Sequence, residues 1–150
     1  YNLFACTGIL FNHESPLRPI NFVTQKIISS AGNIANGSRE KLILGNLAIE
    51  RDWGWAPEYV EAMWLMLQQE IPEDFVIATG KTNTLEKFVS LTFEAYDLDW
   101  KKYVVQSDEF YRPTDLMISN ADPTYANDRL GWRAKVDINA IILSMVNKKY

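Results

Sequence analysis

The stretch LFACTGILF, residues Leu3–Phe11, is the strongest indicator of fold class in this 150-residue sequence. Its nearly unbroken run of small apolar, aromatic and β-branched residues predicts a buried strand covered on both faces, as strands of parallel sheets are. The next segment, Asn12–Pro19, predicts a loop because Pro16 and Pro19 interrupt it.

Outward from this strand, strand and helix patterns alternate along the chain. Further short strands are predicted over Lys41–Gly45, Asp74–Ala78 and Tyr103–Gln106. Helical spacing of apolar residues, with caps and stop signals, predicts helices over Asn21–Asn36, after Pro57, from Asn83, over Asp122–Leu130 and from Asp137. This alternation predicts an α/β fold with at least some parallel strand pairing.

The helix after Pro57 has the clearest pattern. A proline suits the first helical turn, where its missing N–H would have no helical partner. Val60, Met63, Trp64 and Leu67 follow at helical spacing, and this apolar stripe is predicted to face the core.

Composition and charge exclude several classes of protein. With 47% hydrophobic and 23% charged residues, the chain has an ordinary soluble composition. A net charge of -4 argues against sequence-independent nucleic-acid binding. No apolar run reaches the ~20 residues that span a bilayer, no signal peptide is visible, and the single cysteine, Cys6, excludes an internal disulfide. We therefore expect a cytoplasmic protein that binds neither nucleic acid nor membrane.

The start of the chain and its missing motifs suggest a piece of a longer protein. The sequence begins with Tyr1 instead of methionine and enters an apolar segment at once. It contains no GxGxxG or Walker A loop, no CxxC, no HExxH and no GxSxG, and it has one histidine. Metal catalysis through imidazole or thiolate ligands is therefore not expected, and the chain is not a complete enzyme of a common type.

The polar residues that follow the first strand are the first candidates for a site, because ligands of open α/β sheets bind beyond the carboxyl ends of strands. Asn12, His13 and Arg18 share one predicted loop and offer groups that bind anions and amides. A polar surface loop is the alternative. Lys26 lies near the start of the next helix, where it either helps to bind an anion or is a solvated lysine.

Two arginine segments are the other candidates. Arg51 begins RDWGW and could bind a phosphate bidentately; the alternatives are a surface pair with Asp52 beside core tryptophans, or an aromatic platform for a sugar. Arg112, in YRPTD, could also bind phosphate, and Asp115 could accept hydrogen bonds from hydroxyls; a helix start is the alternative. Together Lys26, Arg51 and Arg112 are compatible with a diphosphate ligand.

Several motifs, in order along almost the whole chain, resemble the GDP-mannose 4,6-dehydratase family of extended short-chain dehydrogenase/reductases. They are GILFNHESP (8–16), NFVTQKI (21–27), LGNLAIERDWGWAPEYVEAMWLMLQ (44–68), PEDFVIATG (72–80), FYRPTDL (110–116) and DPTYANDRLGW (122–132). NHESP and RDWG with its following helix are quite specific to this enzyme, whereas the RP-x-D pattern of FYRPTDL and the D-x-x-x-A-x-x-x-LGW pattern of the last segment are typical of the wider superfamily.

The resemblance implies that residues 1–150 are the C-terminal, substrate-binding part of a Rossmann-like enzyme. They would comprise the last segments of the Rossmann sheet and a small α/β domain that binds the nucleotide sugar. The N-terminal half, with the NADP loop and the catalytic Tyr-x-x-x-Lys pair, is absent, so no catalytic residue is expected here. The family converts GDP-mannose to GDP-4-keto-6-deoxy-mannose with NADP as its cofactor, and it tends to form dimers and tetramers.

The resemblance also implies individual roles. His13 and Arg18 match positions that contact NADP near its nicotinamide end. The positions that match substrate-binding residues are Asn12, Val23, Lys26, Leu44, Asn46, Arg51, Arg112 and Asp115. Among them, Leu44 and Asn46 would hold the base and ribose, Arg51 and Arg112 the diphosphate, and Asp115 the ribose hydroxyls.

Departures from the family pattern leave alternatives open. Asp115 stands where the family more often has glutamate, Trp55 where many members have histidine, and Glu50 where lysine is common. The alternatives are another NDP-sugar reductase or epimerase of the same superfamily, or a non-catalytic binding fragment.

Overall fold

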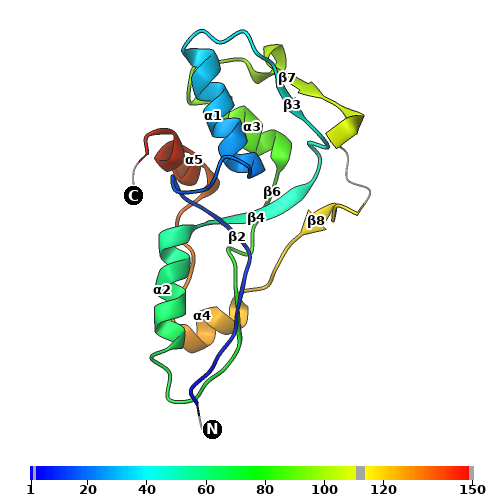
Figure 1. Cartoon of the computed structure of the whole chain (residues 1–150). Helices are drawn as coiled ribbons and strands as arrows, with labels where there is room; N and C mark the ends of the chain where they lie inside the picture. Colours follow the sequence, from blue (N-terminus) through cyan, green and yellow to red (C-terminus); the bar gives the residue numbers. More distant parts are fainter. Residues whose placement is uncertain (2, 111–113, 149–150) are drawn as a thin grey trace.

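The central element of the fold is strand β4, Glu50–Trp55, which crosses the middle of the molecule (Figure 1). In the computed structural model, which describes residues 1, 3–110 and 114–148, β4 connects two groups of helices. One group comprises α1 (Val23–Ala35), α3 (Leu85–Glu94) and α5 (Ile138–Val146). The other comprises α2 (Ala56–Met66) and α4 (Thr124–Leu130).

The two halves of β4 have different neighbours. Its second half pairs in parallel with β2 (Asn12–Glu14), with His13 opposite Gly54. Its first half lies between antiparallel β6 (Thr82–Thr84) and parallel β8 (Ile118–Ser119). Residues from four distant parts of the sequence therefore meet along one strand.

The remaining strands of the described residues form two further parallel pairs. β1 (Gly8–Leu10) pairs with β5 (Phe75–Ile77), and β3 (Leu42–Leu44) pairs with β7 (Val104–Gln106). The 3₁₀ helices η1 (Trp100–Lys102) and η2 (Asp108–Phe110) flank β7. Parallel pairs that are connected through helices confirm the predicted α/β class.

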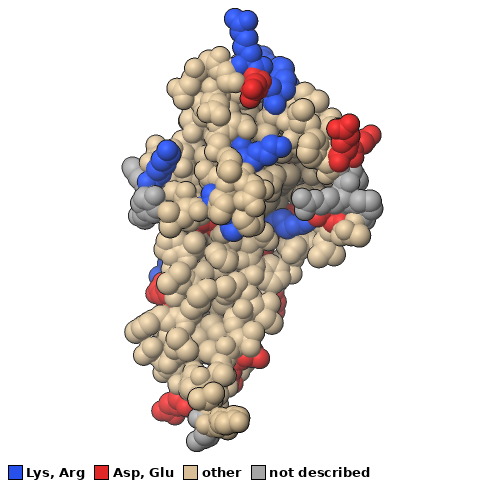
Figure 2. All heavy atoms as spheres, in the orientation of Figure 1, with Lys and Arg blue, Asp and Glu red and all other residues tan. Residues whose placement is uncertain are grey.

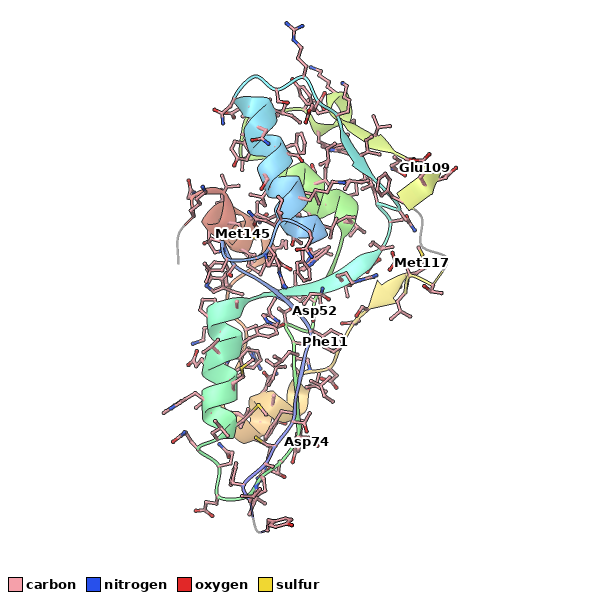
Figure 3. The ribbon with its side chains drawn as sticks, viewed as in Figure 1. Phe11, Asp52, Asp74, Glu109, Met117 and Met145 are labelled. Atoms are coloured by element: carbon pink, nitrogen blue, oxygen red, sulfur yellow. The ribbon has the colours of Figure 1, made fainter. Side chains whose placement is uncertain are left out.

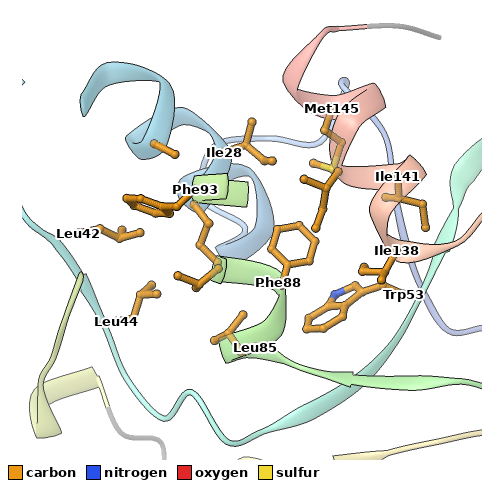
Figure 4. Packing of buried hydrophobic residues seen from close by; sticks show 14 of the residues in the cluster. Ile28, Leu42, Leu44, Trp53, Leu85, Phe88, Phe93, Ile138, Ile141 and Met145 are labelled. Carbon is orange, nitrogen blue, oxygen red and sulfur yellow. The ribbon is translucent and has the colours of Figure 1, made fainter. Parts of the chain in front are cut away.

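Each group of helices has its own hydrophobic core. Figure 4 shows the larger one, in which Phe88, Phe93 and Ile141 are fully buried between α1, α3 and α5. The smaller core packs α2 and α4 against β5, around Tyr59 and Phe75.

The structure corrects the interpretation of Leu3–Phe11 as one buried strand. Only Gly8–Leu10 form a strand, Leu3 is 78% exposed, and Ile9 is 52% exposed. The first residues of the predicted loop, Asn12–Glu14, are themselves a strand. Within the described residues β1 has β5 as its one paired neighbour, so its other edge is not paired with a strand there.

The structure also corrects the predicted orientation of α2. The stripe of Val60, Met63, Trp64 and Leu67 is between 37% and 61% exposed. The buried side of the helix consists of Tyr59, Ala62 and Met66. Both sides have apolar residues at helical spacing, so periodicity alone could not decide which side faces the core.

The remaining helix predictions agree with the structure to within a few residues. Asp137 caps α5 by accepting a hydrogen bond from the Ala140 N–H at 2.9 Å. The cap of α3 is Thr84 rather than Asn83, because the Thr84 hydroxyl accepts from the Lys87 N–H at 3.1 Å. Within the ranges given above, none of the helices has the length and apolarity that crossing a membrane requires.

A polar cluster attaches α4 to the segment before β5. The Tyr125 hydroxyl donates to one Glu73 carboxylate oxygen at 2.6 Å, and Arg129 Nη2 donates to the other at 2.7 Å. The Tyr125 ring stacks on Phe75 with 5.5 Å between centroids. The hydrogen bond from Tyr125, reinforced by Arg129, lowers the pKa of Glu73 below its usual value of 4.5.

This cluster predicts a pH-dependent contribution to stability. We expect Glu73→Gln to unfold at a lower temperature than the wild type near neutral pH, and this difference to vanish in acid. A carboxylate whose pKa is depressed by folding stabilises the protein above its unfolded pKa, here about 4.5, and loses that effect as pH falls through the lower folded pKa. Thermal unfolding across this pH range measures the difference. Exposed Glu70→Gln is the control, and an equal pH dependence in both variants would contradict the assignment.

Candidate functional site

The candidate site is a cleft of about 630 Å³ between the start of α1, the end of β3, the first half of β4 and the segment around η2. Figure 3 places Glu109 of η2 and Met117, just before β8, on the same side of the molecule as the end of β3. Of these strands, β3 brings its carboxyl end to the cleft, as predicted for an open α/β sheet, whereas Arg51 lies in the first half of β4 and Asn12 begins β2.

The cleft gathers most of the residues that the sequence suggested for substrate binding. Its lining includes Asn12, Val23, Lys26, Leu44, Asn46, Arg51 and Asp115. The other suggested residue, Arg112, lies outside the described residues. His13 and Arg18, which the resemblance linked to the cofactor, do not line the cleft.

Lys26 is held at the wall of the cleft by two contacts. Its ammonium group donates to the Ile43 carbonyl at 2.9 Å and lies 5.1 Å from the centre of the Phe110 ring. Backbone N–H groups at the start of α1 add a partial positive charge nearby. Lys26 is therefore oriented within the cleft and is not a freely solvated lysine.

Arg51 is held at the boundary between β4 and β8. Its Nη1 donates to the carbonyls of Glu50 and Leu116 at 2.8 and 2.7 Å. Its Nη2 lies 3.5 Å from an Asp115 carboxylate oxygen, and the side chain is 16% exposed. The guanidinium is thus preorganised at the cleft with one carboxylate beside it.

Asp52 does not form the surface pair with Arg51 that one interpretation suggested. It is fully buried and accepts hydrogen bonds from Thr79 N, Thr79 Oγ1 and Gly80 N at 3.0, 2.7 and 2.8 Å. Trp53 is a core residue that packs against Phe88, as that same interpretation predicted for the tryptophans. Asp52 therefore fixes the loop after β5, while its neighbour Arg51 faces the cleft.

The charges at the cleft are of both signs, and so are those on the upper part of the face shown in Figure 2. Lys and Arg side chains lie on the upper part of this face, whereas its lower part consists mostly of uncharged residues. Lys26 and Arg51 line the cleft together with the carboxylates of Glu109 and Asp115. Such a set offers cations for phosphate oxygens and acceptors for hydroxyl groups.

Asn46 adds an amide to this set. Its Oδ1 accepts from the Ala48 N–H at 2.9 Å, and its Nδ2 lies 3.5 Å from the Met117 sulfur. A sulfur atom is a weak acceptor, so the NH₂ group is available to a stronger one. Asn46 can thus present a donor to a base or ribose oxygen.

His13 and Arg18 form a separate polar network at the end of β2. Arg18 donates to the buried Glu14 carboxylate at 2.9 Å and to the His13 carbonyl, and its guanidinium lies 4.6 Å from the Phe22 ring centre. Thr24 Oγ1 donates to the same carboxylate at 2.8 Å. This network fixes the backbone that leads from β2 into α1.

A family model described as GDP-mannose 4,6 dehydratase matches residues 1–145. The chain belongs to this family. GDP-mannose 4,6 dehydratase 2 of Arabidopsis thaliana is 48% identical over 148 residues, which cover 99% of this chain and 40% of that protein. GDP-mannose 4,6 dehydratase of Homo sapiens is 43% identical over 164 residues, which cover 98% of this chain and 44% of that protein. The chain therefore spans less than half the length of these relatives.

Solved structures of other enzymes have the same fold as this GDP-mannose 4,6 dehydratase family member. RMD from Pseudomonas aeruginosa, complexed with NADPH, matches with a TM-score of 0.85 and 15% identity, over 95% of this chain and 46% of that chain. UDP-glucose 4-epimerase from Thermotoga maritima, with UDP-glucose, matches with a TM-score of 0.80 and 24% identity, over 95% of this chain and 44% of that chain. These likenesses confirm the predicted fold, that of an extended short-chain dehydrogenase/reductase.

Two of the departures from the pattern of the GDP-mannose 4,6 dehydratase family lie outside the cleft lining. Trp55 is buried in the larger core, and the Glu50 carboxylate accepts from the Thr82 hydroxyl at 2.8 Å. The third, Asp115, reaches the cleft through its contact with Arg51. Of these three positions, Asp115 is the one that lines the cleft.

Sequence reasoning missed several residues that shape this family member's site. Phe110 lines the cleft, and a Cβ added at Gly45 would lie 2.5 Å from its carbonyl oxygen, so a glycine permits this close approach. Gly54 and Tyr59 form a second close contact beside His13. A glycine within a strand is a known signal for such approaches and could have indicated Gly54.

Metal ligands were not expected, and the described residues contain no group of three or more His, Cys, Asp or Glu side chains that could hold a metal ion.

Proposed function

We propose that this chain is the nucleotide-sugar-binding part of a GDP-mannose 4,6-dehydratase. Residues 1–150 would comprise the last Rossmann-sheet segments and the small α/β domain of a longer parent protein, which converts GDP-mannose to GDP-4-keto-6-deoxy-mannose. The observation that carries this proposal is the single cleft in which Lys26, Arg51, Asn46 and Asp115 meet. Membership of the family supports it independently.

Each polar residue of the cleft has a role that suits a GDP-sugar. Arg51 and Lys26 would hold the diphosphate, because hydrogen bonds from cations to phosphate are short and strong. The predicted role of Arg112 at the same diphosphate stays part of the proposal. Asn46 and Asp115 would hydrogen-bond the base and ribose.

The remaining cleft residues would complete the binding surface. Leu44 and Val23 provide apolar walls. Asn12, at the start of β2, offers an amide to the sugar nucleotide. Apolar walls with a few placed polar groups are typical of small-molecule sites.

The cofactor in this proposal is NADP, which would accept a hydride from the sugar and return it. The polar groups at the end of β2 fit such a group: His13 keeps one ring nitrogen, an acceptor in the neutral ring, for a ligand, and the guanidinium of Arg18 is held in place by Glu14. These residues would bind and orient the cofactor. The Tyr-x-x-x-Lys pair is absent from this sequence and would lie elsewhere in the parent protein.

The rest of the parent protein would also cover apolar surface that this chain leaves open. Ile9 of β1 and the outer side of α2, with Val60, Trp64 and Leu67, are exposed. Exposed apolar side chains on one strand and one helix face favour burial against another part of the protein. Assembly into dimers or tetramers and a cytoplasmic location stay predictions.

The decisive experiment identifies the product of the parent protein. We expect incubation with GDP-mannose and NADP to yield a GDP-4-keto-6-deoxy sugar, which NMR spectroscopy distinguishes from an epimer by its 6-methyl group. An epimer or a reduced sugar would favour the alternative NDP-sugar reductase or epimerase. A parent sequence without a glycine-rich loop and Tyr-x-x-x-Lys would overturn the enzymatic proposal in favour of a non-catalytic binding fragment.

A further inference from the structure

We propose that Tyr59 is a positioning residue that holds the plane of the His13 imidazole and so keeps the ring in the hydrogen bond with Phe11 that sets its tautomer. The inference rests on the proposed function, in which His13 contacts the dinucleotide. It concerns a residue outside the cleft and on a different element from His13.

The contact between the two rings is close and nearly parallel. The centroids of His13 and Tyr59 lie 4.7 Å apart, and their planes differ by 28°. Tyr59 is fully buried, and Trp132 packs edge-on against it at 5.9 Å and 88°. The Trp132 indole N–H donates to the Glu58 carbonyl at 2.9 Å, which holds this second ring in turn. Tyr59 is therefore a rigid surface for the imidazole.

The space for the Tyr59 ring exists because residue 54 is glycine. Gly54 is the register partner of His13 in the β2–β4 pair, so a side chain there would lie beside the imidazole on the same face of the sheet. A Cβ at Gly54 would be 2.2 Å from the Tyr59 ring. The Tyr59 ring thus fills the place that a side chain at residue 54 would otherwise occupy.

A hydrogen bond to the backbone fixes the tautomer of the His13 imidazole. His13 Nδ1 lies 2.7 Å from the Phe11 carbonyl oxygen. Because a carbonyl only accepts hydrogen bonds, Nδ1 carries the proton, and in the neutral ring Nε2 is the acceptor that remains for a ligand. The stack fixes the plane of the ring, and the hydrogen bond fixes its tautomer.

The phenol hydroxyl of Tyr59 is not what positions the histidine. Its oxygen is buried and has no hydrogen-bond partner among the described residues. Burial, with the nearby charges of Asp52 and Glu58, raises the pKa of Tyr59, so the side chain is a neutral phenol. The ring itself is the functional part, and a phenylalanine would preserve it.

The test compares Tyr59→Leu with Tyr59→Phe in the full-length parent protein. Two-bond ¹⁵N–¹H spectra report the tautomer of the His13 ring, whose signals are assigned from their loss in His13→Asn. We expect the Nδ1–H tautomer in the wild type and in Tyr59→Phe, and a mixture of tautomers in Tyr59→Leu. Met66→Ala is the matched control, because it removes buried volume from the same helix and core but keeps the Tyr59 ring that stacks on His13.

Affinity for NADPH, measured by its fluorescence, provides the second readout, with GDP affinity measured alongside. We expect Tyr59→Leu to weaken NADPH binding by roughly 2- to 12-fold, the range that the loss of an aromatic pair represents, while GDP binding is unchanged. An unchanged His13 spectrum in Tyr59→Leu, or an equal change in Met66→Ala, overturns the positioning role. A second outcome separates this inference from the proposed function. If the His13 spectrum changes in Tyr59→Leu but NADPH affinity stays the same in both Tyr59→Leu and His13→Ala, the cofactor role of His13 is overturned and the positioning role is not.

Discussion

In the parent protein, Arg51→Ala is expected to weaken GDP binding by about 1.5–3 kcal/mol, the contribution of hydrogen bonds to a charged partner. This free energy corresponds to a loss of roughly 10- to 150-fold in affinity. The arginine is already held at the cleft by the carbonyls of Glu50 and Leu116, so little ordering is needed when a diphosphate binds. Its removal also leaves Asp115 without the cation beside it. Isothermal titration calorimetry with GDP measures the loss.

Two further variants make this result specific. Arg51→Lys should recover part of the affinity, because lysine keeps the charge but not the two-pronged geometry of the guanidinium. Arg129→Ala removes an arginine that pairs with Glu73 far from the cleft, and it should leave GDP affinity unchanged. A loss below about 1 kcal/mol for Arg51→Ala would contradict the diphosphate role.

The second large effect is expected for Gly54→Ala. The added methyl group would lie 2.2 Å from the Tyr59 ring, and real Cβ atoms essentially never approach so closely. Tyr59 is fully buried between Trp132 and His13, so the ring cannot move aside freely. Overpacking of this kind costs about 1–3 kcal/mol, and the upper end applies here because a rigid ring receives the methyl. The fall in unfolding free energy can be followed by denaturant titration.

Gly8→Ala is the matched control for this substitution. Gly8 is also a strand residue, but a Cβ there would meet the ends of the Leu10 and Met66 side chains at 3.3 and 3.6 Å, and these side chains can adjust. We expect its stability to stay within about 1 kcal/mol of the wild type. Equal losses of unfolding free energy in Gly54→Ala and Gly8→Ala would contradict this explanation. They would show that replacing any strand glycine destabilises the protein, whether or not the new methyl group meets Tyr59.

Most helices of this chain could be predicted because their signals are local. The spacing of Ile27, Ala31 and Ile34 places one side of α1 in the core, and the cap at Asp137 marks the start of α5. By contrast, β4 was not recognised as the central strand. RDWGW has no alternating pattern, and its role depends on β2, β6 and β8, which come from other parts of the sequence.

The sequence indicated which residues belong to the candidate site, but not which of them contact one another. Motifs singled out Lys26, Arg51 and Asp115, and the structure brings all three to one cleft. Motifs did not reveal that Arg51 faces Asp115 instead of Asp52, since that choice depends on the pairing of β4 with β8.

By itself, the sequence determined the α/β class, the family and the identity of the polar residues near the strand ends. These properties depend on periodicity, caps and motifs, which residues close together in the chain define. Only the tertiary structure decided that α2 buries Tyr59 and exposes Trp64, and that Gly54 makes room for the ring that stacks on His13. The physical reason is that both outcomes depend on packing between residues far apart in the chain, and local patterns do not specify which apolar surface meets which.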